Sequence, residues 1–235
     1  MTLVLISLLA AVATWIAALA YRRVWKRLDP RGRGPPGFGA VLAPALLTAA
    51  LLGGASRALC LALAAATVGS LIYWIDDARE MSARVRVAIA AITGLAIGAA
   101  YFLEAGLSLP VLVVLLMLAA FVHLALVNTI NMQDGADLNL PVFVLLTGAL
   151  LLAYGGGSTD WRTAAIACLA FTAPFALQNR RPRSIYFGDS VGLAFAALFT
   201  IMGAAFLTGG AQPPEGGAHA RLPRGGRACG PPPPI

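Results

Sequence analysis

The sequence has little charge and few residues that could crosslink it. Only 11% of its 235 residues are charged, whereas 59% are hydrophobic, and its mean hydropathy is strongly positive. Soluble globular domains carry about 25% charged residues, so this composition excludes an ordinary water-soluble domain. The three cysteines are widely spaced, which excludes a disulfide framework and a cysteine-rich metal site. We therefore predict an integral membrane protein.

Apolar segments alternate along the chain with short polar stretches. Each segment is near the roughly 20 residues that a helix needs to cross the hydrocarbon layer, although a few are short. We predict an all-α fold, a polytopic transmembrane bundle over residues 1–208 with about eight spans, followed by a disordered Pro/Gly-rich tail over residues 209–235. The expected spans are residues 2–21, 40–54, 57–75, 85–103, 109–127, 140–155, 162–178 and 188–208.

Basic residues are distributed unevenly between the two sides of this predicted bundle. No basic residue precedes the first span, and four follow it, so we place the N-terminus outside the cell. The loops on the side of the membrane opposite the N-terminus then hold most of the 17 basic residues, which marks that side as cytoplasmic. This distribution accounts for the net charge of +7 without binding to nucleic acid. This cytoplasmic set consists of Arg22, Arg23, Lys26, Arg27, Arg31, Arg33, Arg79, Arg84, Arg86, Arg180, Arg181 and Arg183.

A polar stretch over residues 128–137 interrupts the apolar chain after the fifth span. Asn128, Asn131 and Asp134 follow one another at spacings of three, which keeps them on one side of a helix, and Asp137 comes next. Amide and carboxylate oxygens suit a hard cation or a phosphate bound to one. The alternative is a polar cytoplasmic loop in which these residues act as caps and turn formers.

Two adjacent carboxylates, Asp76 and Asp77, follow the third span on the same predicted face. They repel each other and lose hydration at a membrane boundary, so they are tolerated mainly beside a cation or in water. The alternative is an interfacial end of the helix, with Tyr73 and Trp74 as interface aromatics and Arg79 as the ion-pair partner.

The last span begins at Asp189 and Ser190, which could form a simple N-cap or carry a metal to an anion at the helix N-terminus. The preceding Arg180, Arg181 and Arg183 either attract phosphates or only contribute to the cytoplasmic charge. His123 lies within an apolar run, and we expect it to be an interior residue or a bundle hydrogen bond.

The order of these motifs resembles that of the polyprenyl-phosphate N-acetylhexosamine-1-phosphate transferases, membrane enzymes that include the lipid I-forming translocase and the initiating transferases of O-antigen and teichoic acid. The matching motifs are Asp76-Asp77, then Asn-x-x-Asn-x-x-Asp-Gly-x-Asp over residues 128–137, then Gly-Asp-Ser over residues 188–190. Looser matches are the Pro/Gly-rich residues 30–39, Arg84 and Arg86, and Asn179 and Pro182.

The chain also departs from the pattern of that family. Leu138-Asn139 replaces the usual Gly-Leu, and Val191-Gly192 replaces Gly-Ser. The later loop with its histidine-rich motif has no counterpart, so we expect a C-terminally truncated member.

The resemblance implies transfer of N-acetylhexosamine-1-phosphate from a UDP-sugar to polyprenyl (undecaprenyl) phosphate, which initiates a cell-envelope polysaccharide. It implies Mg²⁺, with Mn²⁺ as an alternative, and an active site on the cytoplasmic face of the bacterial inner membrane. The implied partners are the UDP-N-acetylhexosamine, the lipid phosphate and the bilayer, and a homodimer is compatible with them. The implied catalytic and metal-binding residues are Asp76, Asp77 and Asp189, and the substrate-binding residues are Asn128, Asn131, Asp134, Asp137, Arg180, Arg181 and Arg183.

Three alternatives stay open at this point. A transporter or channel would use its acidic residues to carry protons or cations, and would place them near the middle of the bilayer. An aspartate-rich prenyltransferase would need aspartates at spacings of four, whereas the spacings here are one and three. A truncated member of the transferase family would be inactive.

Overall fold

The computed structural model describes residues 38–133, 139–154 and 188–208, with isolated positions between residues 12 and 24 and between residues 165 and 177. The elements in these ranges are all helices, and they confirm the prediction of an all-α bundle. Their bounds are η1 Phe38–Val41, α2 Leu42–Gly53, α3 Arg57–Ala78, α4 Ala83–Phe102, η2 Leu103–Ala105, α5 Leu109–Gln133, α6 Asn139–Tyr154 and α8 Asp189–Leu207.

Four of the described helices are long and apolar enough to cross a membrane, namely α3, α4, α5 and α8. The predicted segments 40–54 and 140–155 correspond to the shorter helices α2 and α6. The first and seventh predicted segments and the tail lie largely outside the described residues, so the number of spans and the side of the N-terminus stay predictions.

Local sequence accounts for where the helices turn. Gly54 takes a left-handed conformation with φ of 66°, and its backbone N–H bonds the carbonyls of Ala50 and Leu51, which ends α2. Two residues later the Ser56 hydroxyl accepts a hydrogen bond of 3.2 Å from the Leu59 N–H and caps the start of α3. This turn lies at the end of the bundle where Arg57 and Glu104 are 3.9 Å apart.

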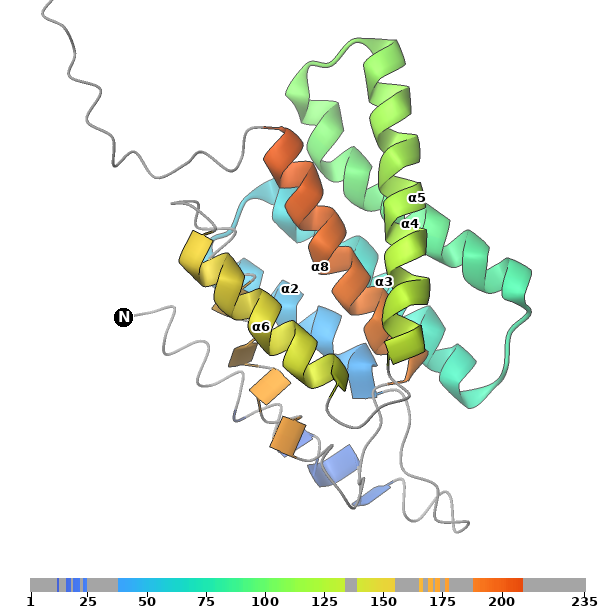
Figure 1. Ribbon diagram of the computed structural model, residues 1–235, viewed down its shortest axis with the longest axis vertical. Helices are drawn as coiled ribbons and strands as arrows, with labels where there is room; N and C mark the ends of the chain where they lie inside the picture. Colours follow the sequence, from blue (N-terminus) through green and yellow to red (C-terminus); the bar gives the residue numbers. More distant parts are fainter. Residues whose placement is uncertain are drawn as a thin grey trace, which may run out of the picture.

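Helix α8 lies at the centre of the bundle and packs against α3, α4 and α5. In its most apolar window 72% of the residues are buried, compared with 22% in α5. Figure 1 shows α8 (orange-red) with α4 and α5 on one side and α2 on the other. Because α8 contacts every other long helix described, its first turn meets the ends of several helices.

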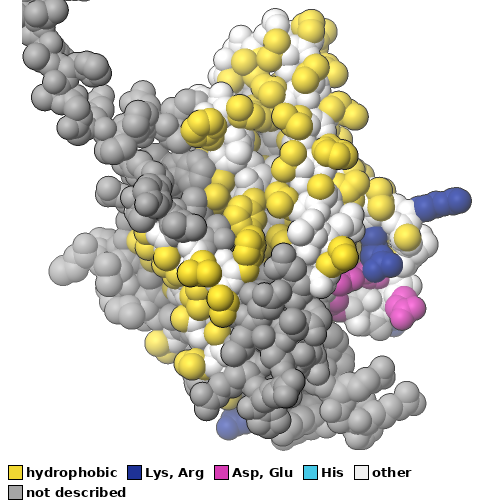
Figure 2. Space-filling view, viewed as in Figure 1, with side chains coloured by type: hydrophobic (Ala, Val, Ile, Leu, Met, Phe, Trp, Pro, Cys, Tyr) yellow, Lys and Arg dark blue, Asp and Glu magenta, His cyan; other side chains and the backbone are white. Residues whose placement is uncertain are grey.

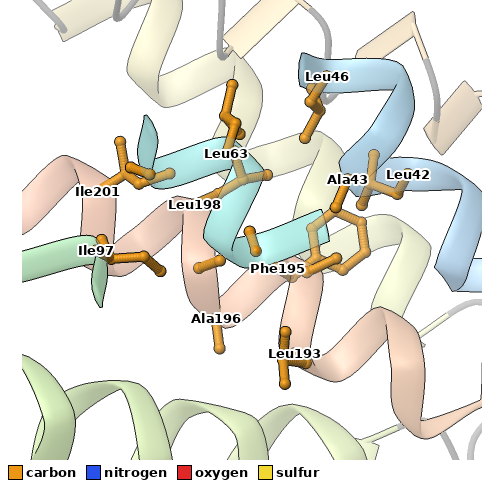
Figure 3. Close-up of a cluster of buried hydrophobic side chains, with 14 of the residues drawn as sticks. Leu42, Ala43, Leu46, Leu63, Ile97, Leu193, Phe195, Ala196, Leu198 and Ile201 are labelled. Atoms are coloured by element: carbon orange, nitrogen blue, oxygen red, sulfur yellow. The ribbon is translucent and has the colours of Figure 1, made fainter. Parts of the chain in front are cut away.

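The core is the layer of small and branched side chains around α8. Phe195, Leu193 and Leu198 of α8 are almost fully buried, and they belong to one buried cluster with Leu42 of α2 and Leu63 of α3. Figure 3 shows the Phe195 ring beside Leu42 and Ala43 of α2, and Ile97 of α4 near Ile201 of α8, whereas Leu193 points away from α2.

The outer surface of the same helices is apolar. On α5, Val114, Met117 and Phe121 are exposed, and Ile92 on α4 is exposed as well. Figure 2 shows hydrophobic side chains over most of the described face, with acidic and basic side chains gathered at one edge near the turn between α3 and α4. A surface of this kind suits contact with lipid rather than with water.

Two helices continue beyond the apolar spans predicted for them, in a way that affects the site. Helix α3 continues past Ile75 to Ala78, so Asp76 and Asp77 lie in its last turn rather than in a loop. Helix α5 continues to Gln133, and its 25 residues are about 37 Å long at 1.5 Å per residue. This exceeds the roughly 30 Å hydrocarbon layer. The helical backbone therefore continues through the polar residues at the ends of α3 and α5. Hydropathy does not detect this continuation, because it marks only the apolar part of each helix.

Glycines on α4 allow α5 to approach closely. A methyl group at Gly94 would lie 2.7 Å from the His123 Cβ and 2.9 Å from the Ala119 carbonyl oxygen, and one at Gly98 would lie 2.9 Å from the Ala119 Cβ. Small residues four apart on one helix are typical of tight packing between membrane helices. This contact fixes α4 against α5 near the middle of the bundle.

Replacement of Gly94 by alanine should separate α4 from α5. Because the new methyl group would meet backbone atoms, we expect Gly94→Ala to destabilise the protein by about 1–3 kcal/mol. Thermal or denaturant unfolding in detergent measures this change. The matched control is Gly203→Ala on α8, where a methyl group would meet no atom within 4 Å. Equal stability of the two variants would contradict the packing described.

Candidate functional site

The polar residues predicted from the sequence gather where the C-terminal ends of α3 and α5 meet the N-terminal ends of α4 and α8. A pocket of about 530 Å³ opens between these helix ends. It is lined by Tyr73, Ala83, Arg86, Val87, Leu124, Asn128, Asn131, Met132 and Asp189. Three of the predicted site residues, Asn128, Asn131 and Asp189, therefore line one pocket, although they come from two helices far apart in the chain.

Asp76 lies behind this pocket in the last turn of α3. Its side chain is only 4% exposed, and its Oδ1 accepts a hydrogen bond from the backbone N–H of Met81. Its Oδ2 lies 3.7 Å from the Nε of Arg86. The buried carboxylate is thus paired with a cation and with the turn that leads to α4, as a buried charge requires.

Arg86 connects Asp76 to Asp189. Its Nη1 donates a hydrogen bond of 3.3 Å to Asp189 Oδ2, while its Nε faces Asp76. The Arg86 side chain is 43% exposed and lines the pocket, and the Asp189 side chain is 37% exposed. One arginine therefore spans two carboxylates that are more than 100 positions apart, and it remains accessible to an anion in the pocket.

Tyr73 differs from the interpretation of it as an interface aromatic. It is only 2% exposed, and its hydroxyl donates a hydrogen bond of 2.9 Å to the Arg86 carbonyl oxygen. Its neighbour Trp74 is 43% exposed and fits the interface role. The predicted partner of the aspartates is also wrong, since Asp76 pairs with Arg86 instead of Arg79. The spacing of three between Tyr73 and Asp76 places both residues on one face of α3. This spacing was the signal in the sequence that could have placed Tyr73 at the site.

Asp77 points to the start of α8. Its Oδ1 accepts a hydrogen bond of 2.8 Å from the Asp189 N–H, and its Oδ2 accepts one of 3.4 Å from the Ser190 N–H. The residue at the N-cap position is Gly188, with φ of 72° and no side chain to serve as a cap. The carboxylate from α3 therefore satisfies the backbone donors that a helix N-terminus leaves free, and its charge is favourable there. Asp189 is the first residue of α8, so the interpretation of Asp189 and Ser190 as a simple N-cap is wrong.

Asn131 lies against α8 at Gly192. A methyl group built on Gly192 would overlap Asn131 Oδ1, so only glycine leaves room for the amide in this position. Asn131 Oδ1 is buried, and it accepts no hydrogen bond from the residues that the structure describes. Gly192, which replaces the serine usual at this position of the motif, is thus the residue of α8 that Asn131 packs against.

Several predicted site residues cannot be compared with this geometry. Asp134, Asp137, Arg180, Arg181 and Arg183 lie outside the described residues, and their roles stay predictions. His123 is described and fully buried, and its Nδ1 lies 3.1 Å from the Thr200 hydroxyl of α8. The expectation of a hydrogen bond inside the bundle is confirmed for this residue.

The oxygens around the pocket fit the divalent cation that the resemblance implies. Mg²⁺ takes one or two protein carboxylates and shares its other positions with substrate phosphates and water. The pocket offers the carboxylate of Asp189 and the side-chain amides of Asn128 and Asn131 as its oxygen-bearing groups. Among the described residues no three His, Cys, Asp or Glu side chains form a ready-made cluster. The metal role of Asp76 and Asp77 stays a prediction.

The fold and this pocket define a polytopic membrane protein with an anion- and cation-compatible site at one end of its bundle. Residues 41–206, more than half of the chain, match the family model described as glycosyl transferase family 4. The chain therefore belongs to glycosyl transferase family 4, which confirms the resemblance found in its motifs.

A curated relative agrees with this family. Over 158 residues the chain is 28% identical to a phospho-N-acetylmuramoyl-pentapeptide-transferase from Acaryochloris marina (strain MBIC 11017). The alignment covers 57% of this chain and 41% of the relative, so the chain spans less than half of the length of that protein.

Alanine at position 192 should displace Asn131 from α8. We expect Gly192→Ala to destabilise the protein by about 1–3 kcal/mol through overpacking. Part of that loss should disappear when Asn131→Ala is added, because the side chain that the methyl group meets is then gone. A double-mutant cycle on unfolding in detergent measures the coupling, which we expect to be about 0.5–3 kcal/mol for side chains in contact. Strictly additive effects would contradict this contact.

Proposed function

We propose that this protein transfers a phospho-sugar from a nucleotide-sugar donor to a polyprenyl phosphate acceptor. The observation that carries the proposal is the pocket of Arg86, Asn128, Asn131 and Asp189 at the end of the bundle, in a chain that belongs to glycosyl transferase family 4. The relative named as a phospho-N-acetylmuramoyl-pentapeptide-transferase supports the same class of reaction.

The reaction brings two anions together, and the pocket is suited to that problem. An oxygen of the acceptor phosphate attacks the sugar-bearing phosphorus of the donor, the bond to the nucleoside phosphate breaks, and the nucleoside monophosphate leaves with the electron pair. Arg86 supplies a fixed positive charge, and the amide N–H groups of Asn128 and Asn131 can donate to phosphate oxygens. A bound Mg²⁺ would offset the negative charge that develops on the leaving group.

The pocket also suits a substrate anchored in lipid. Val87, Leu124 and Met132 supply apolar lining next to the polar groups, and the outer faces of α4 and α5 carry exposed apolar side chains. A lipid phosphate lies at the boundary between these two environments, with its chain in the hydrocarbon and its charge at the surface. An acceptor of this kind can reach the pocket without leaving the membrane.

The roles of the three aspartates follow from their surroundings. Asp189 lines the pocket and is partly exposed, so we propose it as the residue that holds the metal. Asp76 and Asp77 are engaged with Arg86 and with the start of α8, and we assign them no step of the reaction. A UDP-N-acetylhexosamine as the donor, initiation of a cell-envelope polysaccharide and a cytoplasmic site are the finer parts of the proposal, and they come from the resemblance and the charge distribution.

The position of the described carboxylates favours this function over a transporter. Asp76, Asp77 and Asp189 lie at helix ends, whereas a proton or cation pathway would need acidic groups near mid-bilayer. Within the four described helices that can cross a membrane, the intervening segments between those ends contain no aspartate or glutamate.

The test is a transfer assay with the purified full chain. Radiolabelled UDP-N-acetylglucosamine, undecaprenyl phosphate and Mg²⁺ should give a product that partitions into organic solvent. We expect Asp189→Asn to lower kcat at least about 100-fold, a loss typical of removing one transition-state contact. The amide keeps the shape of the side chain and removes its charge.

The matched control is Glu104→Gln, which removes an exposed carboxylate at the opposite end of the bundle. It should leave the rate unchanged. Product formation that persists in Asp189→Asn would remove this residue from the mechanism. A folded wild-type protein that gives no product with any UDP-N-acetylhexosamine would contradict the proposed function.

A further inference from the structure

We infer that Asp77 is a positioning residue, which holds the first turn of α8 and thereby places the carboxylate of Asp189 in the pocket. The contact between Asp77 and α8 is observed in the geometry of the chain, whereas its effect on catalysis rests on the proposed function. This positioning role differs from the expectation drawn from the resemblance, in which Asp77 would contact the acceptor or the metal.

Both oxygens of the Asp77 carboxylate are occupied by backbone donors of α8. Oδ1 lies 2.8 Å from the Asp189 nitrogen, and Oδ2 lies 3.4 Å from the Ser190 nitrogen. Asp77 does not line the pocket, whereas Asp189 does. A carboxylate engaged in this way stabilises a helix start, and its distance from the pocket lining separates it from the groups that would contact a substrate.

The start of α8 depends on this distant cap because it lacks a local one. Gly188 has no side chain, its φ is 72°, and no side chain at the N-cap position bonds the first turn. A helix leaves four N–H groups without internal partners at its N-terminus, and here two of them are satisfied from α3. The cap at the start of α8 is therefore supplied by Asp77, which precedes Asp189 by 112 positions in the chain.

The same turn carries Asp189, the carboxylate that we propose as the metal ligand. Asp189 is held twice, through its N–H by Asp77 and through its side chain by Arg86. Removal of the first contact leaves the ion pair intact but frees the backbone of the turn. A displacement of about 1 Å at a reacting group is enough to lower a rate about 100-fold.

The experiment compares Asp77→Asn with Asp77→Ala in the full-length protein. Asparagine keeps one acceptor oxygen, which can retain the shorter bond of 2.8 Å to the Asp189 N–H and gives up only the longer one to Ser190. Because asparagine caps helices about as well as aspartate, Asp77→Asn should keep most of the wild-type kcat. Asp77→Ala removes the acceptor and should lower kcat about 100-fold with KM unchanged, because the turn is displaced while the rest of the pocket is intact. Glu80→Gln, which removes an exposed carboxylate from the same end of the bundle, serves as the charge control and should behave as wild type.

Hydrogen exchange measured by mass spectrometry provides a readout that needs no activity. Peptides that span residues 188–192 should exchange slowly in wild type and Asp77→Asn, and about tenfold faster in Asp77→Ala, as the loss of an N-cap implies. If Asp77→Asn keeps this protection but is as inactive as Asp77→Ala, the carboxylate acts in the chemistry and the inference is overturned.

The two proposals can fail separately. Equal protection of the 188–192 peptides in wild type and Asp77→Ala would overturn the positioning role whatever the assay shows. A wild-type protein that is protected but makes no product would contradict the proposed function, while the exchange data would still support the role of Asp77 at the start of α8.

Discussion

Charged groups at the end of an apolar bundle must find partners within the protein, and this constraint organises the polar end of the molecule. Asp76 is almost completely buried, so its charge is tolerated only because Arg86 and the Met81 N–H face it. Arg86 reaches Asp189 at the same time. The pairing joins α3, α4 and α8 at one point, and the pocket lies beside that point.

The central position of α8 makes this point sensitive to the whole fold. Its apolar residues form the core with α2, α3 and α4 (Figure 3). Its first residue, Asp189, lines the pocket. Movement of α8 along its axis would break the contacts of Leu193 and Phe195 and would also displace Asp189. Packing in the apolar layer and geometry in the polar layer are therefore set by one helix.

Membership in glycosyl transferase family 4 gives these contacts a chemical meaning. Substrates of phospho-sugar transfer carry several negative charges, and a site at the membrane boundary must balance them without excess positive charge when it is empty. Arg86 meets that need because its charge is balanced by two carboxylates, Asp76 and Asp189. Its guanidinium can also donate hydrogen bonds to a phosphate in the pocket. The apolar lining on the other side of the pocket would suit the lipid part of the proposed acceptor.

The sequence by itself determined the membrane class, the helix-forming segments and the motif residues at one end of the bundle. These follow from hydropathy, from charge and from spacings of three or four, which are local properties of the chain. Only the tertiary structure decided the partner of each carboxylate, the cap that Asp77 gives to α8, the burial of Tyr73 and the fit of Asn131 against Gly192. Contacts between residues 103 or 112 positions apart depend on how whole helices pack, and no local pattern encodes that distance.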